Sequence, residues 1–396
     1  DHADESWGPK LDGRPIDQFH GEQQPWVASP NNVRDFFDLG KTYVNNVAVE
    51  RSGERSHFRL GITRTDADGM GPAALLDRTS FALAGGVQVT DRLDVEAGGT
   101  YISRQGENLP GTGYSATNYI QQFTWFGRQV DLSRIKDYKA EDGTQRTWNS
   151  NYHDNPYWIA YENWNRDDRD RLIGRVSARY QLTDWLSAMF RTGRDWYEHN
   201  RKRVRAKDGI NFPDGGFSEE VIERSETNTH FLLTATRPLT SDLTVTATAG
   251  AERRDQNYRL HGVNVATLVV PNIYSLQNAG STPAVRDLVE RKRVNSVLGT
   301  LNLNFRGYLN VDLTGRNDWS STLPEEHNSF FYPSVSGAFV FTDAFGMQSS
   351  FLSSGKVRAG WTRVGNDTDP YQLAATFQST AAWDGLPRFT VPGALP

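Results

Sequence analysis

The chain has 396 residues, of which 37% are hydrophobic and 23% charged, and it contains no cysteine. No apolar run approaches the roughly 20 residues that a membrane-spanning helix needs, whereas a transmembrane β-barrel stays open because only alternate residues of its strands touch lipid. The formal net charge of −5 argues against a nucleic-acid partner, and the lack of cysteine excludes a disulfide framework, a thiolate metal site and a cysteine nucleophile.

The first 40 residues form a polar segment interrupted by several prolines, which predicts irregular structure. One short helical turn is expected at 32–39. The first four residues, DHAD, are neither basic nor apolar and therefore do not start a signal peptide. We accordingly expect either a cytoplasmic protein or a sequence whose beginning is missing.

From residue 41 onward, apolar and polar residues alternate, and a period of two indicates β-strands with two different faces. In the clearest example, Leu301, Leu303 and Phe305 alternate with Asn302 and Asn304, and a tight turn joins this run to the next one. No long amphipathic helix is indicated. About twelve strands are predicted, beginning near residues 43, 58, 81, 93, 172, 186, 231, 243, 297, 309, 335 and 357.

The connections between these strands are alternately short and long. The short ones lie at about 52–56, 90–92, 183–185, 241–242 and 306–308, and the long ones at about 64–78, 103–169, 196–228, 253–293 and 317–332. This asymmetry is typical of an outer-membrane barrel with tight periplasmic turns and long external loops, and a soluble sandwich has no reason to keep it. The sequence therefore predicts an all-β fold, an antiparallel transmembrane β-barrel.

Several motifs rich in Trp, Tyr, Pro and Asn recur along nearly the whole chain. The longest are RNDWSSTLPEEHNSFFYPSVSGAFVFTDAF (316–345) and SSGKVRAGWTRVGNDTDPYQL (353–373). Shorter ones are DESWGPKLDGRPI (4–16), NVRDFF (32–37), LPGTGY (109–114), WFGRQVD (125–131), DNPYWIAYEN (154–163) and RDRLIGRVSARYQLTDWLS (169–187). In this order, the motifs resemble those of the SusC/RagA-type TonB-linked outer-membrane transporters.

The resemblance implies a 22-stranded barrel with an internal plug domain, in the outer membrane of a Gram-negative bacterium. It also implies two partners, a SusD-like surface lipoprotein and the TonB complex, and active import of large nutrients such as oligosaccharides or peptides. We expect the plug and the TonB contact to precede Asp1, and the last barrel strands to follow Pro396. The chain is then a middle fragment, with an irregular or external segment at 1–40 and a partial barrel with long extracellular loops at 41–396.

The longest predicted loop is the candidate substrate site. It carries 12 aromatic residues among the 61 residues from 108 to 168, and aromatic faces beside amide and guanidinium groups suit a sugar or a peptide. The alternative is that these rings pack the loop on itself or onto the lipoprotein lid. The residues expected to face substrate or lid are Tyr114, Trp125, Arg128, Trp148, Tyr157, Trp158 and Trp164.

A second group of candidates lies on the polar faces of two strands. Arg175 and Arg179 share one such face, and Asn310, Asp312 and Arg316 share another. In a barrel these side chains would face the wet lumen, where they pair with the plug or with one another, or guide substrate. On the lipid face, a charge at mid-membrane costs about 2–4 kcal/mol.

No catalytic residue, metal site or cofactor is predicted. Residues 111–116 lack the strand–helix context of a dinucleotide fingerprint, and residues 40–42 lack the glycine that a phosphate loop requires at position 35. The paired acids at 167–168 and 325–326 are expected to be solvated, and 366–369 offers oxygen ligands for calcium but also fits a turn. Two other functions stay open: a soluble extracellular β protein that binds or cleaves carbohydrate, and a passive porin.

Overall fold

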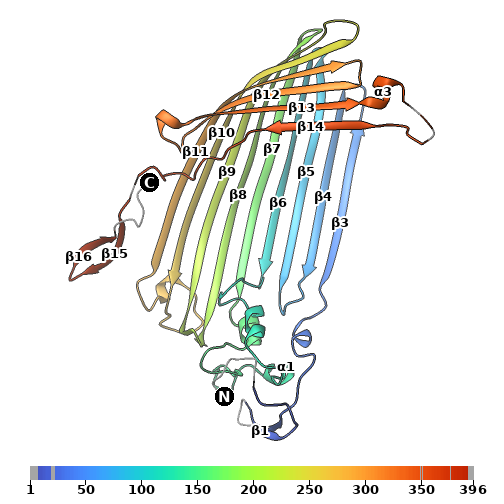
Figure 1. Ribbon diagram of the computed structural model, residues 1–396. Helices are drawn as coiled ribbons and strands as arrows, with labels where there is room; N and C mark the ends of the chain where they lie inside the picture. Colours follow the sequence, from blue (N-terminus) through green and yellow to red (C-terminus); the bar gives the residue numbers. More distant parts are fainter. Residues whose placement is uncertain (1–7, 19–22, 348, 350, 375, 391–396) are drawn as a thin grey trace.

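The fold is one large curved sheet of twelve strands. The computed structural model describes residues 8–18, 23–347, 349, 351–374 and 376–390 (Figure 1). The strands are β3 (Lys41–Ser52), β4 (Ser56–Asp68), β5 (Leu75–Thr90), β6 (Leu93–Glu107), β7 (Asn165–Thr183), β8 (Leu186–Gly209), β9 (Phe212–Pro238), β10 (Leu243–Val265), β11 (Ala284–Phe305), β12 (Leu309–Ser320), β13 (Ser329–Val340) and β14 (Lys356–Thr362).

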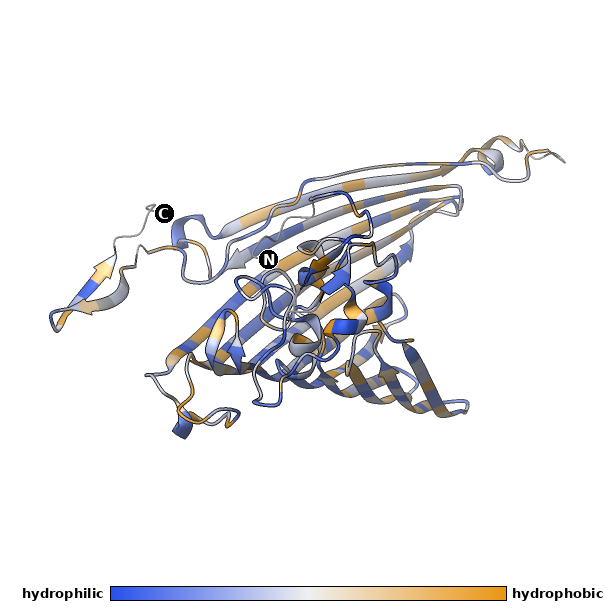
Figure 2. Ribbon diagram, turned by 90° about the horizontal axis from the view of Figure 1, so that it is seen from below, coloured by the Kyte–Doolittle hydropathy of each residue, from blue (hydrophilic) through white to orange (hydrophobic). Residues whose placement is uncertain are grey.

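Each strand pairs antiparallel with its neighbours in sequence, so the sheet order runs without crossover from β14 to β3. The predicted all-β fold class and the twelve strands are confirmed. The sheet is not closed, because β3 and β14 form its two edges among the described residues. Figures 1 and 2 show that it curves, with β12, β13 and β14 folding forward over the concave side.

One face of the sheet is apolar although it is exposed, and the opposite face is polar, so the two colours alternate along each strand in Figure 2. Leu301, Leu313, Val335 and Trp361 lie side by side in register across β11 to β14. Leu313 is 41% exposed and Trp361 58% exposed. We call this surface the apolar band; its other large members include Val47, Val49, Leu60, Ile62, Phe81, Leu83, Leu172, Val176, Phe190, Phe231, Leu233, Val297 and Val357.

The apolar band ends where charged residues appear on the same face. Arg64, two residues beyond Ile62, contacts Asp66 and Asp77, with Nη2 2.6 and 2.9 Å from their carboxylate oxygens. On β6 and β7, the hydroxyl of Tyr101 donates to Oδ1 of Asp170 at 2.9 Å. Beyond this level charged side chains occur on both faces, and the regular apolar alternation ends.

The strands are longer than predicted, and the connections correspondingly shorter. The expected connection 196–228 is wrong, because β8 and β9 continue through it and turn only at residues 210–211. The loops expected at 253–293 and 317–332 likewise shrink to 266–283 and 321–328. A period-two pattern of apolar and polar residues arises only where the two faces of a strand differ in polarity. The sequence therefore does not indicate the parts of the strands that extend beyond the apolar band.

The remaining elements are short. The helical turn expected at 32–39 is present as the 3-10 helix η2 (Arg34–Phe36), and two small hairpins, β1 (Pro15–Asp17) with β2 (Gln23–Pro25) and β15 (Gln378–Trp383) with β16 (Leu386–Thr390), lie outside the main sheet. The helices α1 (Leu132–Ile135), α2 (Pro156–Tyr161) and α3 (Phe341–Phe345) each have six residues or fewer. Among the described residues, none of the helices has the length and apolar character needed to cross a membrane.

Candidate functional site

The polar face of the sheet carries pairs and small groups of side chains that are hydrogen-bonded across adjacent strands. Thr234 of β9 and Thr248 of β10 lie opposite each other with hydroxyl oxygens 3.0 Å apart. On the next strands, Nδ2 of Asn302 donates to Oδ1 of Asp312 at 2.6 Å, and Nδ2 of Asn310 donates to Oδ2 at 2.9 Å. The predicted lumen residues Asn310 and Asp312 thus hold each other in place on this face.

Arg316 is the centre of a second network, on β10 to β12. Its guanidinium lies 2.7 Å from Oε2 of Glu252, 2.6 Å from Oδ1 of Asp318 and 2.7 Å from Oγ of Ser296. The ring of His230 on β9 approaches the same Glu252 carboxylate at 3.6 Å. Because Glu252 is only 13% exposed and faces two basic groups, this network fixes the relative positions of four strands.

Arg175 and Arg179 lie on the same polar face, four residues apart on β7, but the fold does not bring them to the Arg316 network. Their strand is separated from β12 by four others. Within the described part of the chain, neither forms an ion pair with a carboxylate. Both are exposed, so their charges are available to a ligand or to another part of the protein.

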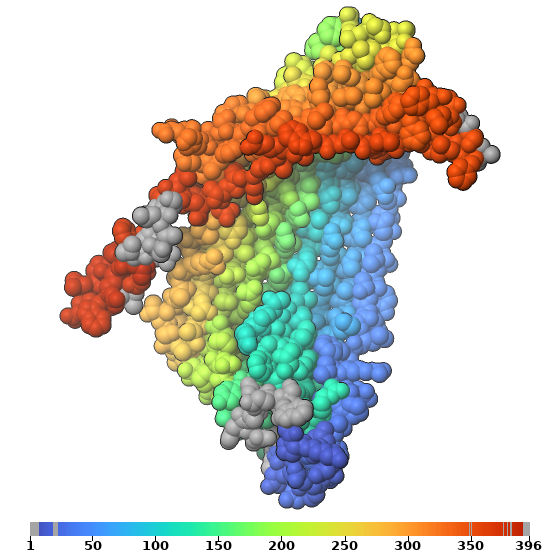
Figure 3. Space-filling model, viewed as in Figure 1, coloured from blue at the N-terminus to red at the C-terminus, as the bar shows by residue number. Residues whose placement is uncertain are grey.

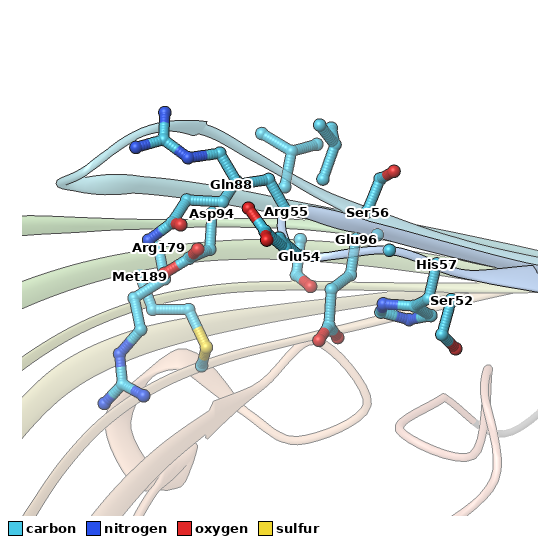
Figure 4. Close-up of a pocket in the computed structure, with 15 residues that line it drawn as sticks. Ser52, Glu54, Arg55, Ser56, His57, Gln88, Asp94, Glu96, Arg179 and Met189 are labelled. Atoms are coloured by element: carbon cyan, nitrogen blue, oxygen red, sulfur yellow. The ribbon is translucent and has the colours of Figure 1, made fainter.

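Arg179 lines a cleft of about 650 Å³ at the end of the sheet where the short turns lie. Figure 4 shows Arg179 of β7 beside Asp94 of β6, and Glu96 of β6 beside His57 of β4, with β5 between those two strands. The ring of His57 has room because Gly86 has no side chain; a Cβ there would lie 2.7 Å from Cε1 of the ring. The cleft also contains residues 52–56 of the turn between β3 and β4.

The connection between β6 and β7, residues 108–164, has a core of its own. Helix α2 is capped by Asn155, whose side chain accepts from the N–H of Tyr157 at 2.8 Å and donates to the carbonyls of Ile135 and Arg146. This core joins the loop to η2 at Phe36, whose ring lies 4.8 Å from that of Tyr157. The buried members are Phe36, Tyr119, Phe126, Val130, Leu132, Ile135, Trp148, Tyr157, Ile159 and Ala160.

The seven loop candidates therefore occupy different environments. Three of them, Trp148, Tyr157 and Trp158, are 8%, 5% and 2% exposed, so their main contacts are within the loop. Tyr114 is 84% exposed and Arg128 is exposed, and these two can reach a ligand directly. The last two are half-buried: Trp125 stacks on His153 at 5.7 Å between ring centroids, and Trp164 packs with Tyr274, Val204, Phe217 and Val265.

Burial changes the acid–base properties of the loop. Asp154 is 5% exposed, and its Oδ1 accepts from Nε2 of Gln145 at 2.8 Å and from the N–H of Ile210 at 2.7 Å. Burial raises the pKa of Asp154, since these bonds only partly offset the loss of water. Burial likewise raises the pKa of Tyr157 to about 12, which keeps its hydroxyl neutral. The Ile210 contact ties the loop to the tip of the β8–β9 hairpin.

Sequence reasoning missed an ion pair that ties β11 to the segment after β14. Nζ of Lys292 on β11 lies 2.5 Å from Oδ1 of Asp367, and Oγ of Ser320 donates to the other oxygen at 2.5 Å. Both charged side chains are 15% exposed. The pKa of Asp367 is lowered, because these bonds outweigh the opposing effect of burial. The segment considered for calcium thus has its Asp367 carboxylate engaged by a lysine, 75 residues away in sequence.

Comparison with known proteins supports the fold. No protein-family model matches the sequence, and neither does any curated protein. Among solved structures, "Structure of the RagAB peptide importer in the 'closed-closed' state" superposes with a TM-score of 0.74 at 16% identity, covering 96% of this chain and 42% of that one. "Structure of the RagAB peptide transporter" gives 0.73 at 15% with the same coverage. The 'open-open' importer gives 0.71 at 16%, covering 91% and 40%.

The chain thus spans about two fifths of the length of the solved structures that it matches. At this level of identity the likeness concerns the fold alone, and the fold is the one that the sequence motifs led us to expect. The resemblance to SusC/RagA-type transporters is therefore confirmed in the fold: this chain has the architecture of part of the β-barrel seen in the RagAB structures.

Proposed function

We propose that this chain is part of a TonB-dependent transporter in the outer membrane of a Gram-negative bacterium. The observation that carries the proposal is the apolar band, which lies opposite a continuous polar face on one curved sheet. A water-soluble β-sandwich would cover such a band with a second sheet, and among the described residues no second sheet does so. Lipid is the environment in which this exposure is favourable. We assign the protein no enzymatic role.

In this proposal, substrate first meets the external loops and then moves along the polar face. The hydroxyl and amide groups offer weak, exchangeable hydrogen bonds, and the Arg316 network has its charges already paired, so it would not hold a passing ligand tightly. A SusD-like lipoprotein would cover the external end, and the TonB complex would act through a plug. Because the solved neighbours are described as peptide importers, we propose peptides as the substrate class before oligosaccharides.

The test uses the full-length protein, expressed in its own or a related host. We expect it in the outer-membrane fraction, with an electrophoretic mobility that changes on boiling, and we expect a lipoprotein to co-purify with it. Uptake of labelled peptides should stop when the proton gradient that drives TonB is abolished. A soluble protein without a heat-dependent shift would contradict the proposal and favour the carbohydrate-binding alternative. Uptake that persists without the gradient would favour a passive porin.

A further inference from the structure

Four arginines gather on the polar face of β7 to β10, near the level where the apolar band ends. We call Arg169, Arg171, Arg224 and Arg254 the arginine cluster. In register, Arg171 on β7, Tyr197 on β8, Arg224 on β9 and Tyr258 on β10 form a single row across the sheet. The guanidinium of Arg169 lies over the ring of Tyr197, 3.9 Å from its centroid.

Two carboxylates lie among these arginines and a third, Glu290 of β11, faces Tyr258 in the same row, so the cluster keeps a formal excess of one positive charge. Asp195 accepts both bonds of Arg171, at 2.8 Å from Nε and 2.5 Å from Nη2. Glu226 accepts instead from two neutral amides, those of Asn228 at 2.7 Å and Gln256 at 2.6 Å. The charges of Arg224 and Arg254 act on Glu226 without a direct contact.

The remaining arginines are left with unused donors. Among the described residues, Arg169, Arg224 and Arg254 form no ion pair. The Nε atoms of Arg169 and Arg254 are buried and have no hydrogen-bond partner there. Buried donors of native proteins normally have a partner, and a planar guanidinium fits a carboxylate with two parallel bonds. The free donors of this cluster therefore suit a carboxylate ligand.

The dimensions of the cluster suit a particular kind of ligand. Arg224 and Arg254 lie on adjacent strands, and Arg254 is four residues from Tyr258, the register partner of Arg224, so the two arginine backbones are about 14 Å apart. In an extended peptide, side chains on one face repeat every ~7 Å, so residues i and i+4 are also about 14 Å apart. We propose that the arginine cluster binds alternate carboxylate side chains of an acidic peptide. This inference rests on the proposed transport function and narrows its substrate class.

The experiment measures binding to the detergent-purified full-length protein, with and without its lipoprotein, by fluorescence anisotropy. The probes are a labelled peptide of alternating Ala and Glu, the same peptide with Gln in place of Glu, and an oligomer of galacturonic acid. The test variant combines Arg224→Gln with Arg254→Gln. The matched control is Arg253→Gln, because Arg253 neighbours Arg254 on the opposite face and contacts Asp255 instead. The heat-dependent mobility shift verifies that each variant is folded.

We expect the unaltered protein to bind the Glu peptide at least tenfold more tightly than the Gln peptide, and the double variant to lose about tenfold for the Glu peptide only. Arg253→Gln should keep the preference. Equal binding of both peptides by the unaltered protein would overturn the inference while leaving transport intact, whereas binding of no peptide would refute the proposed peptide transport itself. A preference for the galacturonate oligomer would overturn the peptide assignment. A double variant that loses thermal stability but keeps its preference for the Glu peptide would overturn the inference and indicate that the arginines contact the plug.

Discussion

The assigned facing of the sheet can be tested at two adjacent residues of β12. Leu313 belongs to the apolar band, and Asp312 lies on the polar face between the amides of Asn302 and Asn310. Leu313 is four residues from the start of β12, which places it about 9 Å from the band edge for a strand tilted by ~45°. In a band about 25 Å high, this is close to the middle.

Leu313→Arg should therefore destabilise the inserted barrel by about 2–4 kcal/mol, a factor of roughly 30 or more in the folding equilibrium. Asp312→Asn keeps a side chain of the same shape in water and loses one amide contact, or about 1 kcal/mol. The assay compares the amount of heat-modifiable protein in the outer membrane for both variants of the full-length chain. Equal accumulation of the two would refute the assigned facing.

Three further predictions concern the end of the sheet that carries the long connections. Lys292→Met should leave Asp367 buried without its cation, so that limited proteolysis cuts the segment after β14. In the unaltered protein, the same segment should become sensitive to protease only when the pH falls below about 4, because the folded pKa of Asp367 is lowered and the carboxylate stays charged above that pH. Because the folded pKa of Asp154 is raised, the stability of the loop should decline as the pH rises from 4 to 7. Asp154→Asn should make this decline smaller. The measurement compares the melting temperatures of both proteins at pH 4 and pH 7, and the same pH-dependent difference in both would contradict the prediction. Gly71→Ala should lower the melting temperature of the loop core seen by tryptophan fluorescence, because its Cβ would clash with the hydroxyl of Tyr119; an unchanged temperature would show that the ring can move.

The sequence predicted the strands wherever their two faces meet different surroundings. Leu301, Leu303 and Phe305 alternate with asparagines because they lie on the apolar face of the sheet and the asparagines on its polar face, and the same contrast marks the other predicted strands. Beyond the apolar band charged residues occur on both faces, so residues 196–228 carry no regular alternation and their sequence predicts a loop. The structure places them in the longest hairpin of the sheet.

The sequence predicts which loop is rich in aromatic residues, but it does not predict which of these side chains are exposed. An aromatic-rich loop is visible in the sequence, yet Trp158 and Tyr114 look alike there and are 2% and 84% exposed. The difference depends on α2 and its contact with η2, which are tertiary features. The ion pair between Lys292 and Asp367 is equally invisible, because nothing local links residues 75 positions apart. Only the register of β11 and the return of the chain after β14 bring them together.

The long hairpin of β8 and β9 has a consequence for how a ligand is received. In the space-filling view, residues of this hairpin form an unbroken wall together with their neighbours on the sheet (Figure 3). The backbone of β8 and β9 is fixed by hydrogen bonds to neighbouring strands on both sides, so this segment is ordered by folding and not by ligand binding. Association then loses less conformational entropy than it would with free loops. For the proposed transport function, this means that the rim of the sheet is already ordered before a ligand arrives.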